Sequence, residues 1–549
     1  MFSRKNPSRL VIAAIAAAGV AFGYFYLRGT FSWKSEPLES AKVIPDEAVM
    51  AAYFITDSQR WSKFQQFGTP AARGAIARRL QNLETQLLSQ HNLDYETDLQ
   101  PWVGNITLAW VPSTTTSEAP LISQPNYLMV VEIKNKLRAW LFARNFKSKQ
   151  DVKRQVFNYK GVELAEIISP MGTPLYQTML ENKLLLSGNR STLETAIDTH
   201  LGEPSFASIP AAAKQLASGE NAGDAIANFY IPDYSEGIKQ LQRQIGDRTS
   251  VVSPIQTVKS ASIAVGVEDV GLRVRVRTEI DPQWFESQPA AAGQILDRFP
   301  AETLAFVSGE NLANSWTALV AQTEVQPELA GAVTLIRQAF AAANLNADRD
   351  IFRWIDGEFA AGLISSQQGL LGQLGFGGVV VLETSDRATA EATLAKLDAI
   401  GRNLLPFPVS ISSRTVNGVL VREWKIPMQG ALLGHGWLDD DSLFLAIGGP
   451  MVDAIATPPT ASIQENPNFR AIADSLPNPN QGYFYLEMEK FLNAFNALPL
   501  FVGTQIPPET QAMLNSIRGI GVTGTWSDPT QYETHMLFSL KKTKELTNP

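Results

Sequence analysis

Imidazole and carboxylate groups that could hold a metal ion stand close together at one place, where His435 precedes the run Asp439-Asp440-Asp441. Such groups are common ligands of divalent ions, and a bound ion can activate water for hydrolysis. One hypothesis is therefore a metal-assisted hydrolase that uses His435 and Asp439–Asp441. The same run is also typical of an exposed acidic turn between two strands.

A second acidic segment has Asp94, Glu96 and Asp98 at alternate positions. A calcium loop would need further oxygen ligands, a glycine at its sharp turn and a closing glutamate. The chain instead continues into Pro101-Trp102. We expect Asp98 to cap a short helical turn by accepting backbone N–H groups.

Other residue types that carry chemistry are scarce in this chain. It has no cysteine and four histidines, which excludes disulfides and thiolate metal sites. It contains no Gly-x-Ser-x-Gly, His-Glu-x-x-His or phosphate-binding Gly-Lys-Ser/Thr pattern. A net charge of −8 argues against nucleic acid as a partner. We therefore assign no catalytic, cofactor-binding or metal-binding residue and expect a protein that is not an enzyme.

One loop is more apolar than exposed loops usually are. Residues 369–378 mix glycines with large apolar side chains. A hairpin loop is one interpretation. Exposed apolar side chains are also typical of contact sites, so the other interpretation is contact with a membrane-protein partner through Leu370, Leu371, Leu374 and Phe376.

The elements that would position these groups begin with an uncharged apolar run, Leu10–Leu27, preceded by three cations at Arg4, Lys5 and Arg9. A helix over this run is about 27 Å long, close to the roughly 30 Å hydrocarbon core of a bilayer. Basic residues favour the cytoplasmic side. The sequence thus predicts a single-pass membrane protein with a cytoplasmic tail (1–9), a transmembrane helix (10–27) and its bulk in the periplasm or thylakoid lumen. A cleaved signal peptide is the alternative.

The chain after this run contains two similar halves. Pro45-Asp46-Glu47 recurs as Pro300-Ala301-Glu302, and Trp102 recurs as Trp354 in the same relative order. Motifs repeated in order are the signature of internal duplication. We expect a tandem repeat, with a spacer (28–42), a first module (43–281), a connector (282–297), a second module (298–541) and a C-terminal tail (542–549).

Hydrophobic periodicity predicts the elements of the first module. Helices are expected at 71–90, 137–147 and 192–199. Strands are expected at 49–55, 105–111, 127–133, 183–186 and 227–231, with hairpins that turn at 160–161 and join 261–267 to 272–280. In the second module, Asn417-Gly418 is typical of a type I′ hairpin turn.

Short connections between adjacent strands favour antiparallel pairing. The predicted fold class is therefore α+β. An N-terminal transmembrane helix would precede two tandem homologous modules, each a mainly antiparallel sheet with packed helices.

The Pro45-Asp46-Glu47 opening, the long helix and the segment Asp98–Gly104 carry a resemblance to a known family. With the strand near 180–184, they resemble the bacterial family called domain of unknown function 3352. The resemblance covers nearly the whole chain after residue 43, although the second module has Trp354-Ile355-Asp356-Gly357 where the first has Trp102-Val103-Gly104. It implies a largely cyanobacterial distribution and an N-terminal membrane segment, and it brings no activity and no site residues.

These observations favour a membrane-anchored extracytoplasmic protein that binds or assembles partners without catalysis. A second hypothesis is a carrier that holds an apolar ligand, a lipid or a pigment, in a cleft between sheet and helices. The metal-assisted hydrolase is the third.

Overall fold

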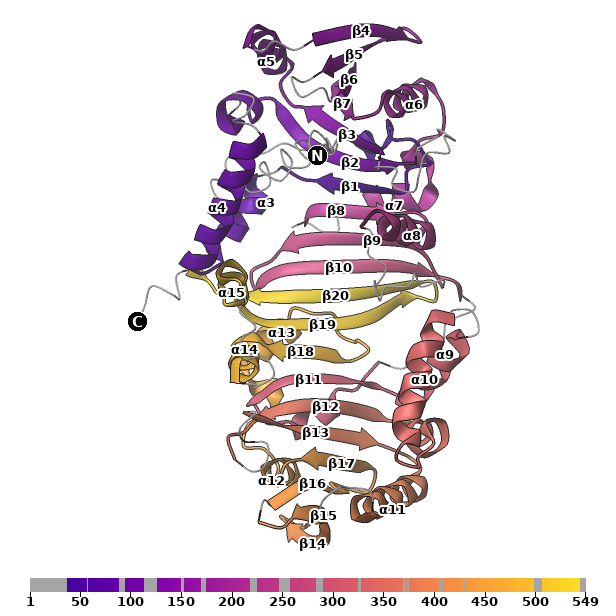
Figure 1. Ribbon diagram of the computed structural model, residues 1–549, viewed down its shortest axis with the longest axis vertical. Helices are drawn as coiled ribbons and strands as arrows, with labels where there is room; N and C mark the ends of the chain where they lie inside the picture. The colour runs from indigo at the N-terminus through magenta and orange to yellow at the C-terminus, as the bar shows by residue number, and fades with distance from the viewer. Residues whose placement is uncertain are drawn as a thin grey trace, which may run out of the picture. The chain divides into compact units, whose positions relative to one another are not determined.

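The protein is described by a computed structural model (Figure 1). The described residues are 37–543, with gaps at 57, 88–93, 113–125, 150–152, 169–173, 218–224, 246–256, 283–289, 324–326, 369–371, 373–374, 404–407, 429 and 498–505.

Two compact units make up the chain. Unit 1 comprises Met1–Asp281 with Lys542–Pro549, and unit 2 comprises Pro282–Lys541. The strands of the described residues belong to a single antiparallel sheet of 20 strands. This corrects the predicted fold class and the predicted tandem repeat, in which two modules would each fold around a sheet of its own. Side-chain periodicity shows which face of a strand is buried, but the extent of a sheet depends on backbone groups at strand edges, which every sequence has.

The membrane prediction is also corrected. Among the described residues, no helix has both the length and the apolar character needed to cross a bilayer. The helix α4 (Pro70–Leu87) is 18 residues long, but it contains three arginines and a glutamate. The single-pass topology and the localisation derived from it are therefore not supported, and the segment Leu10–Leu27 lies outside the described residues.

Unit 1 has its strands in the order β4-β5-β6-β7-β3-β2-β1-β8-β9-β10, and every pair is antiparallel. The strands are β1 (Met50–Phe54), β2 (Val103–Val111), β3 (Asn126–Ile133), β4 (Lys153–Tyr159), β5 (Val162–Ile168), β6 (Pro174–Leu180), β7 (Lys183–Ser187), β8 (Ala225–Ile231), β9 (Val258–Val267) and β10 (Gly271–Ile280). Its helices and helical turns are α2 (Pro37–Ala41), α3 (Ser58–Ser62), η1 (Lys63–Gln66), α4, η3 (Tyr95–Leu99), α5 (Lys136–Lys149), α6 (Arg190–Leu201), η4 (Phe206–Ser208), α7 (Pro210–Ala217) and α8 (Tyr234–Ile245).

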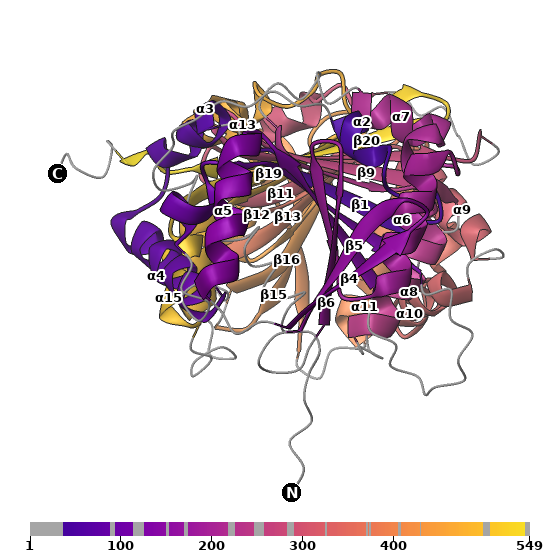
Figure 2. The same cartoon turned by 90° about the horizontal axis from the view of Figure 1, so that it is seen from above.

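The core of unit 1 lies on both sides of its strands. Alternate residues of a strand face opposite sides of a sheet. Accordingly, Leu128 and Val130 pack with α6 residues such as Leu193, whereas Met129 and Val131 pack with Trp102 and Phe142. Figures 1 and 2 show α5 and α6 to either side of strands β5 and β6.

Unit 2 has its strands in the order β14-β15-β16-β17-β13-β12-β11-β18-β19-β20, again antiparallel throughout. The strands are β11 (Thr303–Glu310), β12 (Glu358–Ser365), β13 (Phe376–Glu383), β14 (Ser410–Val416), β15 (Val419–Ile426), β16 (Gly430–Trp437), β17 (Ser442–Ile447), β18 (Tyr483–Glu487), β19 (Ile517–Asp528) and β20 (Gln531–Leu540). Its helices and turns are η7 (Gln294–Arg298), α9 (Leu312–Gln322), α10 (Pro327–Ala341), η8 (Ala347–Ile351), η9 (Phe352–Trp354), α11 (Arg387–Asn403), α12 (Gly449–Ala456), η11 (Ile463–Glu465), α13 (Pro467–Ala473), α14 (Met488–Ala497) and α15 (Pro508–Leu514).

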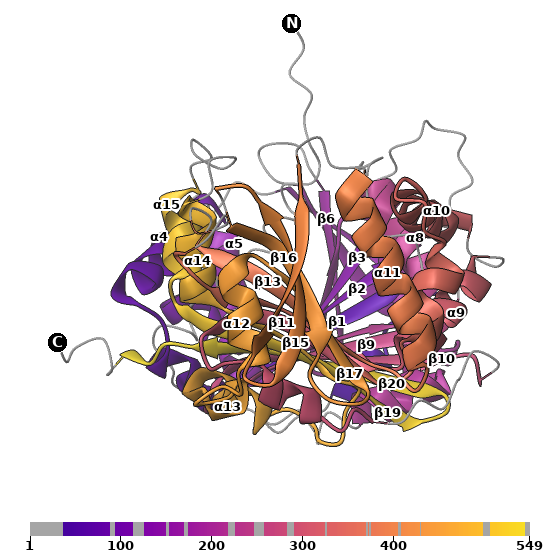
Figure 3. The same ribbon diagram turned by 90° about the horizontal axis from the view of Figure 1, so that it is seen from below.

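Helices α11 and α12 flank the middle strands of unit 2 on opposite faces (Figure 3). Met451 and Val452 of α12 lie next to Gly377 on β13 and Gly434 on β16, where an added Cβ would collide with them. The next residue on β13, Gly378, belongs to the other face, because alternate residues of a strand face opposite sides of a sheet. That second face is the one that α11 covers, and it carries the candidate site.

The predicted hairpin turns are confirmed. Asn417 and Gly418 join β14 to β15 with φ of 47° and 88°, as a type I′ turn requires. Lys160 and Gly161 join β4 to β5 with φ of 47° and 89°. Glycine suits the second position because it has no Cβ to clash at positive φ.

Candidate functional site

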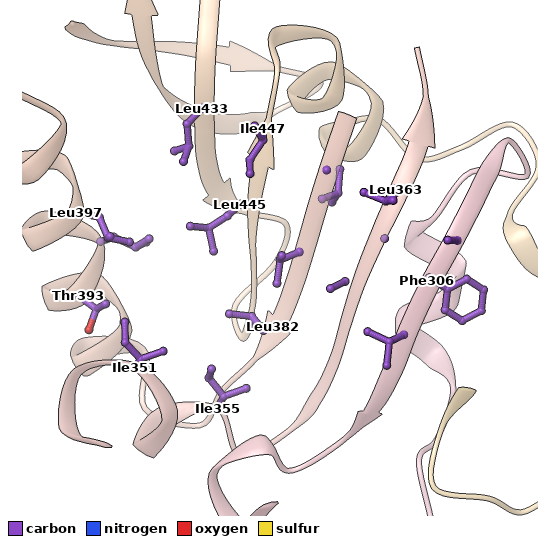
Figure 4. A pocket seen from close by; sticks show the side chains of 18 of the residues that line it. Phe306, Ile351, Ile355, Leu363, Leu382, Thr393, Leu397, Leu433, Leu445 and Ile447 are labelled. Atoms are coloured by element: carbon purple, nitrogen blue, oxygen red, sulfur yellow. The ribbon is translucent and has the colours of Figure 1, made fainter. Parts of the chain in front are cut away.

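A cavity of about 870 Å³ lies between the sheet of unit 2 and its helices (Figure 4). Figure 4 shows Thr393 and Leu397 on one helix opposite Leu382 and Leu445 on the strands. The strands contribute Ala305, Phe306, Val307, Ala361, Gly362, Leu363, Gly378, Val379, Val380, Leu382, Leu433, Leu445, Ile447 and Phe484, and the helical segments contribute Phe340, Ile351, Trp354, Thr393, Leu394 and Leu397. Ile355, which follows η9, completes the lining. The lining is almost entirely apolar.

Small residues on the sheet leave the space open. Ala361 stands between Val307 of β11 and Val380 of β13, and Gly378 stands opposite Leu363 of β12. A Cβ added at Gly378 would meet a single atom, Ile447 Cδ1 at 3.9 Å, which is ordinary contact distance. The floor of the cavity is hollow because these positions carry little or no side chain.

Helix α11 forms the opposite wall with Thr393, Leu394 and Leu397, which share one face at helical spacing. The helix begins after Asp386, whose carboxylate accepts the N–H of Thr389 at 3.1 Å and caps the first turn.

The polar side-chain groups of the lining already donate hydrogen bonds within the protein. The Thr393 hydroxyl donates to the backbone carbonyl of Asp350 at 2.6 Å, and Trp354 Nε1 donates to the same oxygen at 2.9 Å. Both bonds tie α11 and η9 to the turn η8. Neither side chain has a further proton to offer to a molecule in the cavity.

Asp350 anchors this turn although it is 5% exposed. Its carboxylate accepts the N–H of Asn346 at 2.9 Å and lies 3.0 Å from both Arg349 Nε and Lys396 Nζ. The hydrogen bond from Arg349, followed by that from the Asn346 backbone, holds the pKa of Asp350 well below its usual range. The charged form therefore stabilises the wall of the cavity.

A buried polar cluster lies beside the cavity, where His435 of β16 stands opposite the lining residue Leu445. His435 Nε2 is 2.9 Å from Asp398 Oδ1 on α11, and both residues are almost fully buried. Trp424 Nε1 donates to the same oxygen at 2.8 Å, and Arg422 Nη1 lies 3.1 Å from Asp398 Oδ2. Sequence reasoning missed Asp398, because its partners lie on different elements.

The hypothetical metal site is not assembled. His435 pairs with Asp398, whereas Asp439 lies in the turn between β16 and β17, accepts the N–H of Ser442 at 2.7 Å and pairs with Arg298. Within the described ranges, no three acidic or histidine side chains are placed to hold a metal ion together. An acidic turn accounts for Asp439–Asp441.

The acidic segment of unit 1 is a capped turn, with one change from the prediction. Asp94 is the cap, because its carboxylate accepts the N–H of Thr97 at 2.9 Å. Asp98 reaches back and accepts the N–H of Asp94 at 2.9 Å. Asn346 and Asp350 repeat this pair of bonds in unit 2.

Glu310 at the end of β11, Glu358 at the start of β12 and Glu383 at the end of β13 lie near one another at one edge of the strands. Glu310 stands opposite Glu358, whose carboxylate accepts the N–H groups of Gly293 and Ile295. Partial burial, and then repulsion by Glu358 and Glu383, raise the pKa of Glu310 to about 7.

The apolar loop at residues 369–378 lies only partly within the described residues. Phe376 begins β13, whereas Leu370, Leu371 and Leu374 lie outside the described residues. Other apolar side chains mark the rim of the cavity. Val307, Phe484 and Ile447 line it and are 43%, 42% and 45% exposed. No pattern in the sequence indicates these three residues, because each is an ordinary strand residue.

The chain matches, over residues 10–540, a family described as "Protein of unknown function (DUF3352)", and it belongs to that family. No curated protein matches it. Solved structures described as crystal forms IV, III and I of TP0453 are similar at 10% identity, with TM-scores of 0.26, 0.26 and 0.25. The matches cover 44–45% of this chain and 79–80% of those chains.

Proposed function

We propose that this member of the DUF3352 family binds an elongated apolar molecule, the acyl chain of a lipid, in the cavity of unit 2. The observation that carries the proposal is the lining, which offers hydrophobic contact and no available hydrogen-bond donor from its side chains. Ligand pockets of about 300–1,000 Å³ are typical of sites that enclose small molecules, and this cavity is about 870 Å³.

Water is a poor occupant of this cavity. A well-ordered buried water makes about two to four hydrogen bonds to polar groups. The hydroxyl of Thr393 and the indole N–H of Trp354 are both committed to Asp350. Displacing poorly bonded water with an apolar chain is therefore favourable.

The expected affinity follows from the methylene count. Burying about 16 methylene groups gains roughly 13 kcal/mol at about 0.8 kcal/mol each. The translational and rotational freedom lost on binding offsets about 4–5 kcal/mol of that gain. The remainder corresponds to a Kd of about 1 μM.

The test uses variants of the whole chain in which a larger side chain fills the cavity. Gly378→Phe and Ala361→Phe each place an aromatic ring on the hollow floor. We expect each to weaken binding of a fluorescent fatty acid at least about tenfold. Gly331→Phe is the matched control, because Gly331 lies on the exposed surface of α10, where an added Cβ meets nothing within 4 Å.

Extraction provides an independent measurement. Mass spectrometry of organic extracts of the natively purified protein should find an acyl lipid, and a pigment would instead show visible absorbance. The proposal is wrong if extracts are empty and the fatty acid does not bind. It is equally wrong if both filled variants keep the wild-type fold and the wild-type Kd.

A further inference from the structure

Helix α5 (Lys136–Lys149) of unit 1 has a composition unlike the rest of the chain. Its sequence, KLRAWLFARNFKSK, contains five basic and no acidic residues. The whole chain has 46 basic and 54 acidic residues and a net charge of −8. The helix therefore carries a formal charge of +5 in a protein whose net charge is negative.

One face of α5 is held by the core of unit 1. Ala139 and Phe142 pack against the cluster around Trp102, and the rings of Trp102 and Phe142 are 5.3 Å apart. The side chain of Asn135 accepts the N–H of Arg138 at 3.0 Å and caps the first turn. The helix is therefore a fixed part of the unit.

The other face presents large apolar side chains to solvent. Leu137 is 67% exposed, Trp140 is 55% exposed and Leu141 is 37% exposed. Their spacing of three and four residues places them on one stripe of the helix. Exposed side chains of this size, gathered on one stripe and flanked by Lys136 and Arg138, mark a contact surface.

We propose that α5 docks on an anionic phospholipid surface, with its axis parallel to that surface. Tryptophan prefers the boundary between headgroups and acyl chains, and lysine and arginine are attracted by anionic headgroups. A basic helix with tryptophan and leucine on one face is the type that lies in this boundary. At about 21 Å the helix is too short to span a bilayer, so this contact is lateral and differs from a membrane crossing.

The absence of cysteine allows a local measurement on the full chain. Leu137→Cys carries an environment-sensitive fluorophore, and the protein is mixed with vesicles of phosphatidylglycerol and phosphatidylcholine or of phosphatidylcholine alone. We expect a blue shift, and quenching by nitroxide lipids, with the anionic vesicles only. Leu335→Cys is the matched control, because Leu335 on α10 is 69% exposed and should report water throughout.

A charge variant tests the electrostatic part. Each basic residue near an anionic surface contributes about 1 kcal/mol, which is about fivefold in the partition coefficient. Lys136→Gln with Arg138→Gln in the labelled protein should therefore lower the partition coefficient, measured by titrating vesicles, about 25-fold. Raised salt should also lower it, because salt screens the attraction.

Two results would overturn the proposal. The first is a label at position 137 that stays in water with anionic vesicles, whether or not the protein binds them through another segment. The second is an equal response with neutral vesicles or in the charge variant. Neither outcome depends on the cavity of unit 2, so the two proposals stand or fall separately.

Discussion

Replacing Gly401 by alanine should destabilise the protein, although alanine favours helices. Gly401 lies in α11, and a Cβ there would be 2.8 Å from two atoms of the Trp424 ring. The ring has little room to move, because it is 7% exposed and its Nε1 is bonded to Asp398. Alanine gains about 1 kcal/mol of helix propensity, and overpacking a core costs about 1–3 kcal/mol. We expect the free energy of unfolding to fall by up to about 2 kcal/mol.

The matched control is Gly331→Ala on α10. Its new Cβ meets nothing within 4 Å, so the propensity gain remains and the free energy of unfolding should rise by about 0.5–1 kcal/mol. Urea unfolding followed by circular dichroism measures both variants. In a Trp424→Leu background the clash is removed, so Gly401→Ala should no longer destabilise. The reasoning is refuted if both glycine variants shift stability in the same direction, or if the effect at Gly401 is the same with and without Trp424.

Two further predictions concern pH. The folded pKa of Glu310 is about 7, above the value of 4.5 for an unfolded chain, so the folded state holds a proton that the unfolded state has lost, and stability falls as pH rises through this window. Glu310→Gln should therefore raise the free energy of unfolding at pH 8 by about 1–2 kcal/mol, which a higher melting point would show. At pH 4 the substitution should change the free energy of unfolding little, and an equal effect at both pH values would contradict this. For Asp350 the folded pKa is depressed, so its stabilisation is present above the unfolded pKa of about 4 and is lost as pH falls through the folded pKa. Asp350→Asn should cost about 2 kcal/mol at pH 7 and flatten the acid limb of a stability–pH curve, and an unchanged acid limb would count against the assigned role.

Local structure was largely predictable from the sequence. The helix expected at 71–90 is α4 (Pro70–Leu87), and the strand expected at 127–133 is β3 (Asn126–Ile133). Asn417-Gly418 is the predicted turn, because its backbone angles are set by the two residues themselves. Membership of the DUF3352 family was also recognisable from motifs in the chain.

The candidate site was not predictable from the same information. Nothing about Asp398 and His435 indicates that they meet, because they lie on α11 and β16 and come together only through the order of the strands between them. The hypothetical metal site combined His435 with Asp439–Asp441 because these residues are neighbours along the chain. In the strand β16 the imidazole instead faces α11, while the aspartates lie in the turn that follows.

The sequence by itself determined the family through its motifs. It also determined most of the helices, strands and tight turns, because each of these elements depends largely on interactions within a few residues. Tertiary structure decided that the strands belong to one sheet and that a cavity exists at all. Ala361 and Gly378 are unremarkable small residues in a strand pattern. They become the floor of an apolar cavity because β12 and β13 place them diagonally across from each other on the face that α11 covers, and empty space depends on what every neighbouring element fails to fill.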